Sequence, residues 1–214
     1  MKNLVVIGAG GFGREVAGLL WDCFNPREYH FKGFLASESA NMADHGLDIP
    51  VLDDPEVYQP DSEDRFILAI GNIEVRRCVV EALKSKRGEF VSLIHPTATI
   101  FESATLGEGS VVYPHATISN GASIKDFVHL SLYASVGHDG QVGTYSLLSP
   151  YATVNGFGVL ESDVFVGTHA TIGPGTRVGK QSVISANTAV LRNVPSCRMV
   201  FGSPERHLPR LDLF

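Results

Sequence analysis

The sequence predicts a small α/β domain with a parallel sheet over residues 1–93, an all-β parallel β-helix over residues 94–195, and a tail over residues 196–214. A strict six-residue repeat of branched aliphatic residues predicts the β-helix. A glycine turn near the N-terminus, and the alternation of strand-like and helix-like segments before residue 93, predict the α/β domain.

The six-residue repeat consists of two columns of residues. A branched aliphatic residue stands at Ile94, Ile100, Leu106, Val112, Ile118, Ile124, Leu130, Val136, Val142, Leu148, Val154, Leu160, Val166, Ile172, Val178, Ile184 and Val190. Four residues after each of them, from Ala98 to Val194, stands a small residue. A period of six does not fit the 3.6-residue turn of an α-helix, but it fits a short strand followed by a corner. Three such units close one coil of about 18 residues, and between five and six coils stack at ~4.8 Å, with the aliphatic column inward.

The N-terminal domain is expected to alternate strands and helices. We expect strands at Leu4–Ile7, Phe31–Leu35, Arg65–Ile70 and Phe90–Leu93, and helices at Arg14–Trp21 and Ile73–Lys86. This alternation is typical of a small parallel sheet of the Rossmann-like kind.

The glycine turn reads Gly8-x-Gly10-x-x-Gly13, which matches the dinucleotide fingerprint. Glycines let backbone N–H groups approach a phosphate at a helix N-terminus. A dehydrogenase also needs an acidic residue at the end of the second strand, where this chain has Ala36 and Ser37. A sugar nucleotide is therefore the favoured ligand, and NAD or a purely structural turn are the alternatives.

Composition excludes several classes of function. The net charge of -6 argues against a nucleic-acid partner. No run of 18 apolar residues exists, so we expect no membrane span, and the N-terminus reads directly into a strand without a signal peptide. Three widely spaced cysteines, Cys23, Cys78 and Cys197, favour a reducing cytoplasm and offer no metal motif.

The repeats Val142–Ser146 and Val166–Ala170 resemble the left-handed β-helix of the hexapeptide acyltransferases. The resemblance alone implies the left hand, which is an exception to the right-handed crossover rule. The order of the two domains is similar to that of the sialic acid O-acetyltransferases and the bacillosamine and perosamine N-acetyltransferases. Further segments that carry the resemblance are Ala69-Ile70-Gly71-Asn72, Leu93-Ile94-His95-Pro96 and Gly202-Ser203-Pro204.

The resemblance implies two ligands and a homotrimer with active sites between subunits. A nucleotide sugar would bind the first domain at Gly10, Gly11, Phe12, Ala36, Ser37, Gly71 and Asn72. Acetyl-CoA would bind the β-helix and its tail at Gly156, Ala186, Gly202, Ser203, Pro204 and Arg206. Relatives that bind UDP-sugars often have acidic residues after the second strand, so Ala36 and Ser37 argue against a UDP sugar and leave GDP and dTDP sugars open.

The candidate base is His138, in Val136-Gly137-His138-Asp139-Gly140. His138 faces out at a corner, and Gly156, one coil higher, is expected to leave room above the imidazole for a thioester. The family has a His-acid pair at this repeat, which implies that His138 is the general base and Asp139 its partner. Direct attack by a sugar amine would follow, with the Gly156 N–H donating to the oxyanion. The family often has a second histidine nine residues after the base, where this chain has Leu147.

Other functions stay open at this point. A sugar O-acetyltransferase would use the same base, because a histidine serves a hydroxyl as well as an amine. A zinc enzyme resembling the γ-class carbonic anhydrases would pair histidines five residues apart, but Tyr133 and Gly143 stand at those distances from His138, so we expect no metal. A non-catalytic scaffold is the last alternative. We therefore expect an acetyl-CoA-dependent N-acetyltransferase of bacterial surface glycan biosynthesis.

Overall fold

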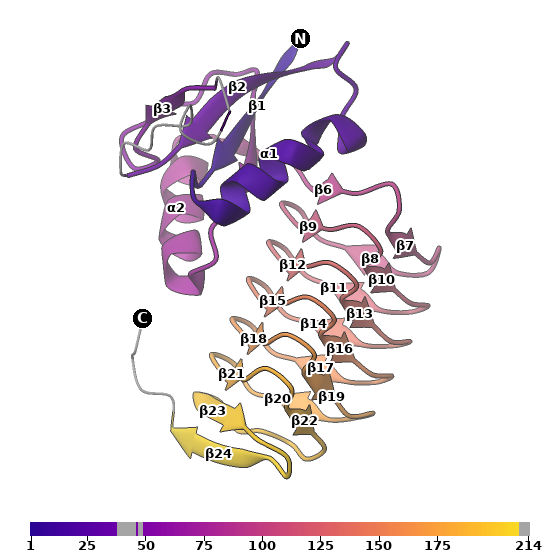
Figure 1. Ribbon diagram of the computed structural model, residues 1–214. Helices are drawn as coiled ribbons and strands as arrows, with labels where there is room; N and C mark the ends of the chain where they lie inside the picture. The colour runs from indigo at the N-terminus through magenta and orange to yellow at the C-terminus, as the bar shows by residue number, and fades with distance from the viewer. Residues whose placement is uncertain (38–45, 47–48, 210–214) are drawn as a thin grey trace. The chain divides into compact units, whose positions relative to one another are not determined.

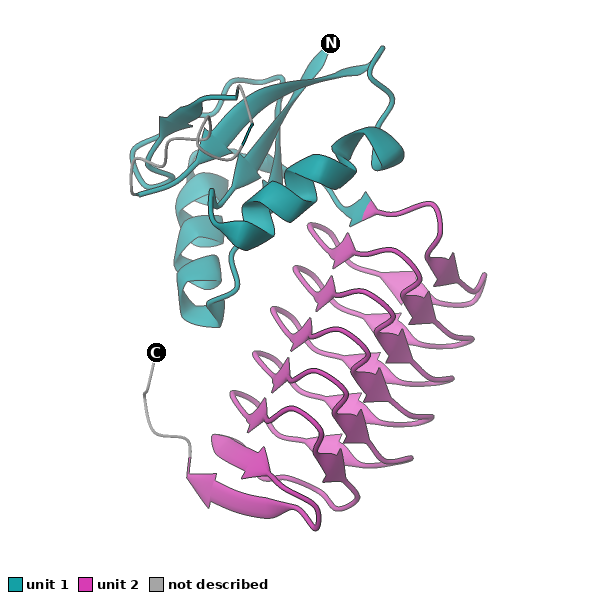
Figure 2. Ribbon diagram, viewed as in Figure 1, with its two compact units in different colours: residues 1–93 teal, residues 94–214 magenta. Residues whose placement is uncertain are grey.

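The computed structural model describes residues 1–37, 46 and 49–209. The chain divides into two compact units, Met1–Leu93 and Ile94–Phe214, which Figure 2 colours separately. In the part that is described, no helix is long and apolar enough to cross a membrane.

The first unit is a five-stranded parallel sheet in the order β3-β2-β1-β4-β5, with two helices (Figure 1). Its elements are β1 (Lys2–Ile7), α1 (Gly11–Cys23), β2 (Tyr29–Leu35), β3 (Val51–Asp53), β4 (Asp64–Leu68), α2 (Ile73–Ser85) and β5 (Glu89–Phe90). Residues Leu4–Ile7 of the central strand are fully buried. The predicted parallel sheet is confirmed.

Beyond shifts of one or two residues at the ends of elements, the structure differs from the predicted elements in three places. Strand β3 was not predicted, because three residues are too short to form a recognisable apolar run. The predicted last strand, Phe90–Leu93, is divided, so that Phe90 ends β5 and Leu93 begins the first strand of the β-helix. Helix α1 begins at Gly11 rather than Arg14, because its first turn is made of the glycines that the pattern assigned to the turn.

The strand order reverses at β1: β2 and β3 are added on one side of β1, and β4 and β5 on the other. In open α/β sheets, ligands bind outside the carboxyl ends of the strands at such a point. The turns that follow β1 and β4 are in close contact there. Gly8 has a φ of +108°, and a Cβ at Gly8 would collide with the carbonyl oxygen of Ala69. The first glycine of the fingerprint is therefore required by the backbone.

The second unit is a parallel β-helix with three faces (Figure 1). One face consists of β7 (Thr99–Ile100), β10 (Thr117–Ile118), β13 (Ser135–Val136), β16 (Thr153–Val154), β19 (Thr171–Ile172) and β22 (Ala189–Val190). The next consists of β8 (Thr105–Leu106), β11 (Ser123–Ile124), β14 (Gln141–Val142), β17 (Val159–Leu160) and β20 (Arg177–Val178). The third consists of β6 (Leu93–Ile94), β9 (Val111–Val112), β12 (His129–Leu130), β15 (Leu147–Leu148), β18 (Phe165–Val166) and β21 (Val183–Ile184).

The register of the β-helix advances by eighteen residues per coil. Val136 pairs with Ile118 below it and with Val154 above it, as the six-residue repeat predicts. The aliphatic column is buried from Val112 to Val190. Ile94, Ile100 and Leu106 are less buried because they belong to the terminal coil. The inward aliphatic column is the source of most of the stability of this unit, because burial of each such side chain contributes about 1.5–3 kcal/mol before chain entropy is subtracted.

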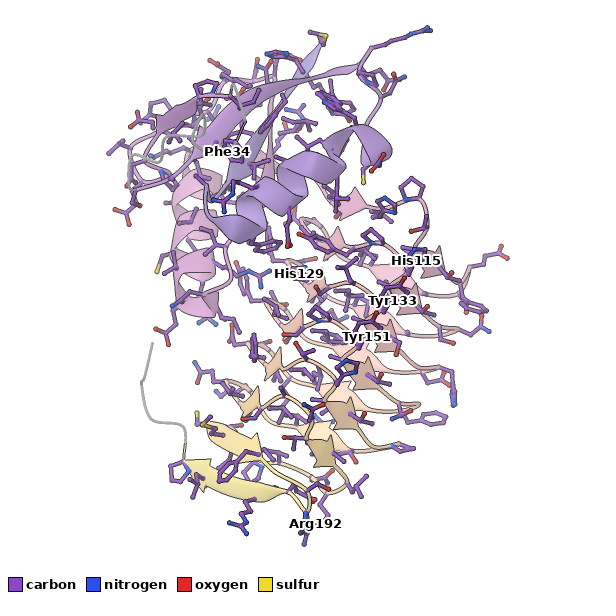
Figure 3. All side chains as sticks on the ribbon, in the orientation of Figure 1. Phe34, His115, His129, Tyr133, Tyr151 and Arg192 are labelled. Atoms are coloured by element: carbon purple, nitrogen blue, oxygen red, sulfur yellow. The ribbon has the colours of Figure 1, made fainter. Side chains whose placement is uncertain are left out.

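The corners of the β-helix share an unusual backbone conformation. From Gly109 to Asn187, the third residue after every aliphatic residue has a positive φ, and most of these residues are not glycine. The left-handed conformation costs roughly 1–2 kcal/mol for a residue with a Cβ. Some corner side chains recover part of this cost by stacking along the axis. His115, Tyr133, Tyr151 and His169 form one such column, with ring centroids 4.7–4.9 Å apart (Figure 3).

A hairpin follows the last coil. Strand β23 (Arg198–Phe201) pairs in parallel with β21, and β24 (Arg206–Pro209) pairs antiparallel with β23. The predicted tail is therefore an ordered strand pair up to Pro209 within the described residues.

Candidate active site

The His138–Asp139 pair lies at the corner that follows β13. His138 Nδ1 is 2.9 Å from Asp139 Oδ2, and the two side chains are 59% and 51% exposed. Asp139 adopts φ +58°, and its N–H donates to the carbonyl oxygen of Asn120 one coil below (2.9 Å). A carboxylate at Nδ1 holds the proton on that nitrogen, so Nε2 of the neutral ring is left as the proton acceptor.

Gly156 lies directly above His138, in the place that the eighteen-residue register predicts. A Cβ built on Gly156 would be 2.5 Å from Nε2 and 2.7 Å from Cε1 of His138. We expected this bare Cα to leave room for a thioester, but the imidazole itself occupies that side of the glycine. The carbonyl of Gly156 accepts from Gly175 N–H at 2.9 Å, whereas the described residues provide no acceptor for the N–H of Gly156, a residue that is only partly buried. That N–H is available to a ligand.

A second glycine supports the acid of the pair. A Cβ on Gly121, one coil below Asp139, would be 2.6 Å from Asp139 Oδ1. The pair therefore lies between two bare Cα atoms, Gly121 on the Asp139 side and Gly156 on the His138 side. Sequence reasoning missed Gly121, although subtracting eighteen from the number of Asp139 identifies its neighbour one coil below.

Phe157 is a further residue that sequence reasoning missed. Its N–H donates to the carbonyl oxygen of His138 (3.0 Å). Its ring meets the imidazole in a T-shaped arrangement, with centroids 5.0 Å apart and planes at 89°. The Phe157 side chain is 60% exposed, so an apolar surface borders the base.

Leu147 stands where the family often has a second histidine. Leu147 is buried in β15 and pairs in register with His129, which is also buried. The leucine side chain adds no polar group to the site.

In the first unit, the glycine turn contains two kinds of glycine. Gly13 is required by packing, because a Cβ there would collide with the carbonyl oxygen of Gly8. Gly10 and Gly11 would each place a Cβ in open space. Helix α1 has no side-chain cap and no acidic residue in its first turn, so its own first turn adds no negative charge against the positive partial charge of the N-terminal N–H groups. This helix end has the properties of an anion site, and Phe12 lies in its first turn.

The N-terminus of α2 is different. Asn72 Oδ1 accepts from the N–H groups of Glu74 (3.0 Å) and Val75 (3.1 Å), and Glu74 adds negative charge to the first turn. Asn72 is therefore a helix cap, while Gly71 beside it faces open space.

Ala36 and Ser37 follow β2, where the Ala36 N–H donates to the carbonyl oxygen of Asp53 (3.0 Å). Glu38, the acidic residue that comes late after this strand, lies outside the described residues.

The predicted acetyl-CoA residues lie at two different corners of the β-helix. Gly156 belongs to the corner column Asn120, His138, Gly156, Pro174 and Arg192, which follows the face containing β13 and β16. Ala186 follows β21 and lies at another corner. The structure therefore brings Gly156 but not Ala186 to His138.

The hairpin loop with Gly202, Ser203, Pro204 and Arg206 is attached to the His138 corner column by an ion pair. Glu205 Oε1 lies 3.0 Å from Arg192 Nε, with the Glu205 side chain almost buried and Arg192 exposed (Figure 3). A hydrogen bond from its own backbone N–H and another from Arg192 hold the pKa of Glu205 below its usual value. This ion pair was not predicted from the sequence.

Comparison with known proteins supplies the context for this geometry. Residues 3–83 match the family model described as the PglD N-terminal domain. GDP-perosamine N-acetyltransferase of Escherichia coli O157:H7 is 28% identical over 144 residues, which are 64% of this chain and 63% of the relative. UDP-N-acetylbacillosamine N-acetyltransferase of Bacillus subtilis is 30% identical over 115 residues, 52% of this chain and 51% of the relative. The matched region thus spans less than two thirds of each curated relative.

Solved structures match over nearly the whole chain. The acetyltransferase domain of PglB from Neisseria gonorrhoeae FA1090, in complex with acetyl coenzyme A, is 28% identical with a TM-score of 0.87. The match covers 97% of this chain and 99% of that domain. PerB from Caulobacter crescentus, in complex with CoA and GDP-perosamine, has the same fold at 24% identity, with a TM-score of 0.87 over 97% of this chain and 98% of PerB. The resemblance predicted from the repeat is confirmed, and with it the fold class: a small parallel α/β domain followed by a left-handed β-helix.

Proposed function

We propose that this chain, a hexapeptide-repeat acetyltransferase by fold and by its relatives, acetylates the amino group of a nucleotide-linked amino-deoxy sugar with acetyl-CoA. The observation that carries the proposal is the His138–Asp139 pair beneath Gly156, on an exposed corner of a β-helix. The relatives named above are nucleotide-sugar N-acetyltransferases, and a solved neighbour is bound to acetyl coenzyme A.

The proposed reaction is a direct transfer. The sugar amine attacks the acetyl carbonyl, and a C–N bond forms as negative charge develops on the carbonyl oxygen. The Gly156 N–H donates to this oxyanion, and His138 Nε2 accepts the proton that the new ammonium loses. Asp139 keeps the other ring proton on Nδ1 and stabilises the imidazolium. The C–S bond then breaks, and the imidazolium returns its proton to the leaving thiolate, so the base is regenerated with free CoA.

The same corner column offers a path for acetyl-CoA. Above Gly156 the next coil presents Gly173, Pro174 and Gly175, and a Cβ at Gly175 would meet nothing within 4 Å. One further coil brings Arg192, whose partner Glu205 belongs to the hairpin loop. A thioester at His138 would therefore extend along bare backbone toward a loop that contains Gly202, Ser203, Pro204 and Arg206.

The sugar nucleotide is assigned to the first unit, where the open glycines Gly10 and Gly11 are the N-cap and the first residue of α1, a helix without a side-chain cap. A diphosphate would accept from those N–H groups. Phe12, Ala36, Ser37 and Gly71 border the same carboxyl edge of the sheet. The relatives act on a GDP sugar and a UDP sugar by name, and Ala36 and Ser37 argue against UDP here and leave GDP and dTDP sugars open.

A homotrimer is proposed because one chain does not assemble all the predicted contacts. Ala186 lies at a different corner from His138, so Ala186 of a neighbouring subunit would complete the acetyl-CoA site. A cytoplasmic role in bacterial surface glycan biosynthesis fits this substrate class.

The experiment is an acceptor panel of GDP-perosamine, dTDP-4-amino-4,6-dideoxyglucose, a UDP-4-amino sugar and a sialic acid, assayed by thiol release from acetyl-CoA. Treating each product with hydroxylamine distinguishes the two acetylation chemistries, because an ester is cleaved and an amide persists. Amide formation on a nucleotide amino sugar is the expected result. Ester formation would establish the O-acetyltransferase alternative, and no thiol release with any acceptor, or stoichiometric zinc in the purified protein, would contradict both.

A further inference from the structure

Phe157 is placed differently from the other exposed corner aromatics of the β-helix. Tyr133 lies between His115 and Tyr151, and Tyr151 lies between Tyr133 and His169, so a ring covers each of their faces. Within the described residues the aromatic contact of Phe157 is with His138 alone. The corner residue one coil above Phe157 is Gly175, around whose Cα the space is open. Phe157 therefore contributes little to a stacked column.

The backbone at Phe157 is also costly for a phenylalanine. Its φ is +58°, in the left-handed region where glycine is favoured. Two other residues of the same corner column, Gly121 and Gly175, are glycines with a φ of +67°. A glycine at position 157 would relieve the backbone strain and remove a ring that is 60% exposed to water. The same φ recurs at every corner from Gly109 to Asn187, so the contact with His138, and not the strain, distinguishes Phe157.

What Phe157 contacts is the base. Three groups define the position of the His138 imidazole: the Asp139 carboxylate at Nδ1, the Gly156 Cα beside Nε2, and the Phe157 ring at 89° to the imidazole plane. Asp139 restrains one nitrogen, and the bare Cα of Gly156 lies against one side of the ring. His138 is 59% exposed, so no packed core limits its rotamers.

We propose that Phe157 is a positioning residue for His138, which keeps the imidazole in the one rotamer that directs Nε2 toward Gly156. This inference rests on the proposed function, because the value of a fixed Nε2 is that a sugar amine must transfer its proton there. Perpendicular aromatic pairs have a preferred geometry, so the phenyl ring restrains the tilt that the Asp139 hydrogen bond leaves free. Displacement of a reacting group by about 1 Å costs on the order of 100-fold in rate.

The decisive variant is Phe157→Gly, because glycine suits the local φ and leaves the coil backbone unchanged. We expect kcat to fall about 10- to 100-fold, while KM for acetyl-CoA and for the sugar stays within about twofold. Phe157→Tyr retains the ring and should restore turnover to near the wild-type value. Tyr151→Gly is the matched control, since Tyr151 has a φ of +60° and is 46% exposed but stacks on Tyr133 and His169. Its turnover should be that of the wild type.

A readout without substrate separates this inference from the proposed function. In the free protein, the phenyl ring current should shift the imidazole C–H proton resonances of His138, which a His138→Gln spectrum assigns. In Phe157→Gly those resonances should move, and a crystal structure should contain more than one His138 rotamer. A single unchanged rotamer in Phe157→Gly, or wild-type kcat, would overturn the inference. If the wild type acetylates no acceptor, the rotamers of His138 in Phe157→Gly still decide the inference. A single unchanged rotamer would then overturn both proposals, whereas several rotamers would overturn only the proposed function.

Discussion

The His138 imidazole lies against the bare Cα of Gly156, so closely that a Cβ on Gly156 would be 2.5 Å from Nε2. The backbone of Gly156 is not in the left-handed region, so its conformation is open to any residue. What would meet an added Cβ is the end of a flexible side chain and not the backbone. The glycine is therefore required by the position of the base rather than by the fold of the coil.

Gly156→Ala should consequently inactivate without unfolding. The methyl group would force the imidazole away from its place beside Asp139, and we expect kcat to fall about 100-fold, as for a misplaced catalytic group. The melting temperature should stay within a few degrees of wild type, because the His138 side chain is exposed and yields to the methyl group. Steady-state kinetics and thermal unfolding by circular dichroism measure the two effects.

The control for this prediction is Gly137→Ala in the same corner. A Cβ on Gly137 would be 2.7 Å from the backbone nitrogen of Gly156 and 3.0 Å from the carbonyl carbon of Asn155. Backbone atoms of a stacked coil cannot move aside, so Gly137→Ala should lower the melting temperature clearly. If both variants melt together at a lowered temperature, Gly156 is a requirement of the fold and the interpretation above is wrong.

The roles within the pair predict an order of effects. His138→Ala should lower kcat by ~10²–10⁴, which is the usual contribution of a general base. Asp139→Asn should lose less, because Asp139 orients the ring and does not take the proton. Asparagine also tolerates the φ of +58° at this position, so its effect is not confounded by the backbone. Turnover measurements on both variants test the order, and an Asp139→Asn loss larger than that of His138→Ala would contradict it.

The sequence predicted the β-helix well because its register is a property of spacing alone. Counting in steps of eighteen correctly placed Gly156 above His138. The same counting did not predict that the imidazole would lie on the glycine, because the side-chain rotamer depends on Asp139 and Phe157 together. The aromatic corners were missed for another reason: a positive φ is unusual for phenylalanine and tyrosine, so no propensity rule predicts them there.

The N-terminal sheet was predicted from its apolar strands, but its polar network was not. Asn3 and Lys32 are far in sequence from Tyr58 and Asp64, and they meet Asp64 only when β1, β2 and β4 are adjacent. Contacts of this kind depend on strand order, which the local pattern of residues does not contain. The ion pair of Arg192 with Glu205 was missed for the same reason.

The open glycines of the first unit predict that the affinities for the two ligands can be changed independently. Gly11→Val should weaken binding of the sugar nucleotide at least tenfold, because the side chain would stand where N–H groups of α1 meet a phosphate. Binding of acetyl-CoA should not change, and neither should the fold, since the Cβ at Gly11 meets no atom within 4 Å. Isothermal titration with each ligand separately measures this. Equal loss of both affinities would mean that Gly11 has a structural role only. Gly13→Ala is the structural control and should destabilise the domain, because its Cβ would collide with the carbonyl oxygen of Gly8.

Asp64 predicts a dependence of stability on pH. Its side chain is buried and accepts hydrogen bonds from Lys32 Nζ (2.9 Å), Tyr58 Oη (2.8 Å), the Asp61 N–H (3.0 Å) and Asn3 Nδ2 (3.1 Å). Burial raises the pKa of this carboxyl. The hydrogen-bond donors, with Lys32 first, lower the pKa by more than burial raises it, so the pKa is below its ordinary value. The folded state therefore favours the charged carboxylate more than the unfolded chain does.

The sign of the effect follows from proton binding. Between the two pKa values the unfolded chain binds more protons than the folded protein, so the free energy of unfolding rises with pH in that range. The contribution of Asp64 to stability is fully present above the unfolded pKa of about 3.9 and is lost as pH falls through the lower folded pKa.

Asp64→Asn should reduce the free energy of unfolding by about 2 kcal/mol at pH 7, because buried donors lose their acceptor. Asp61→Asn should cost less than about 1 kcal/mol, although Asp61 is also bonded to Lys32 at 2.6 Å, because its side chain is 69% exposed. Urea unfolding of the three proteins from pH 7 down to the lowest pH at which they stay folded measures both effects. The gap between wild type and Asp64→Asn should narrow toward acid pH. A gap that stays constant through pH 4 and below would mean that the carboxylate charge of Asp64 does not contribute to stability.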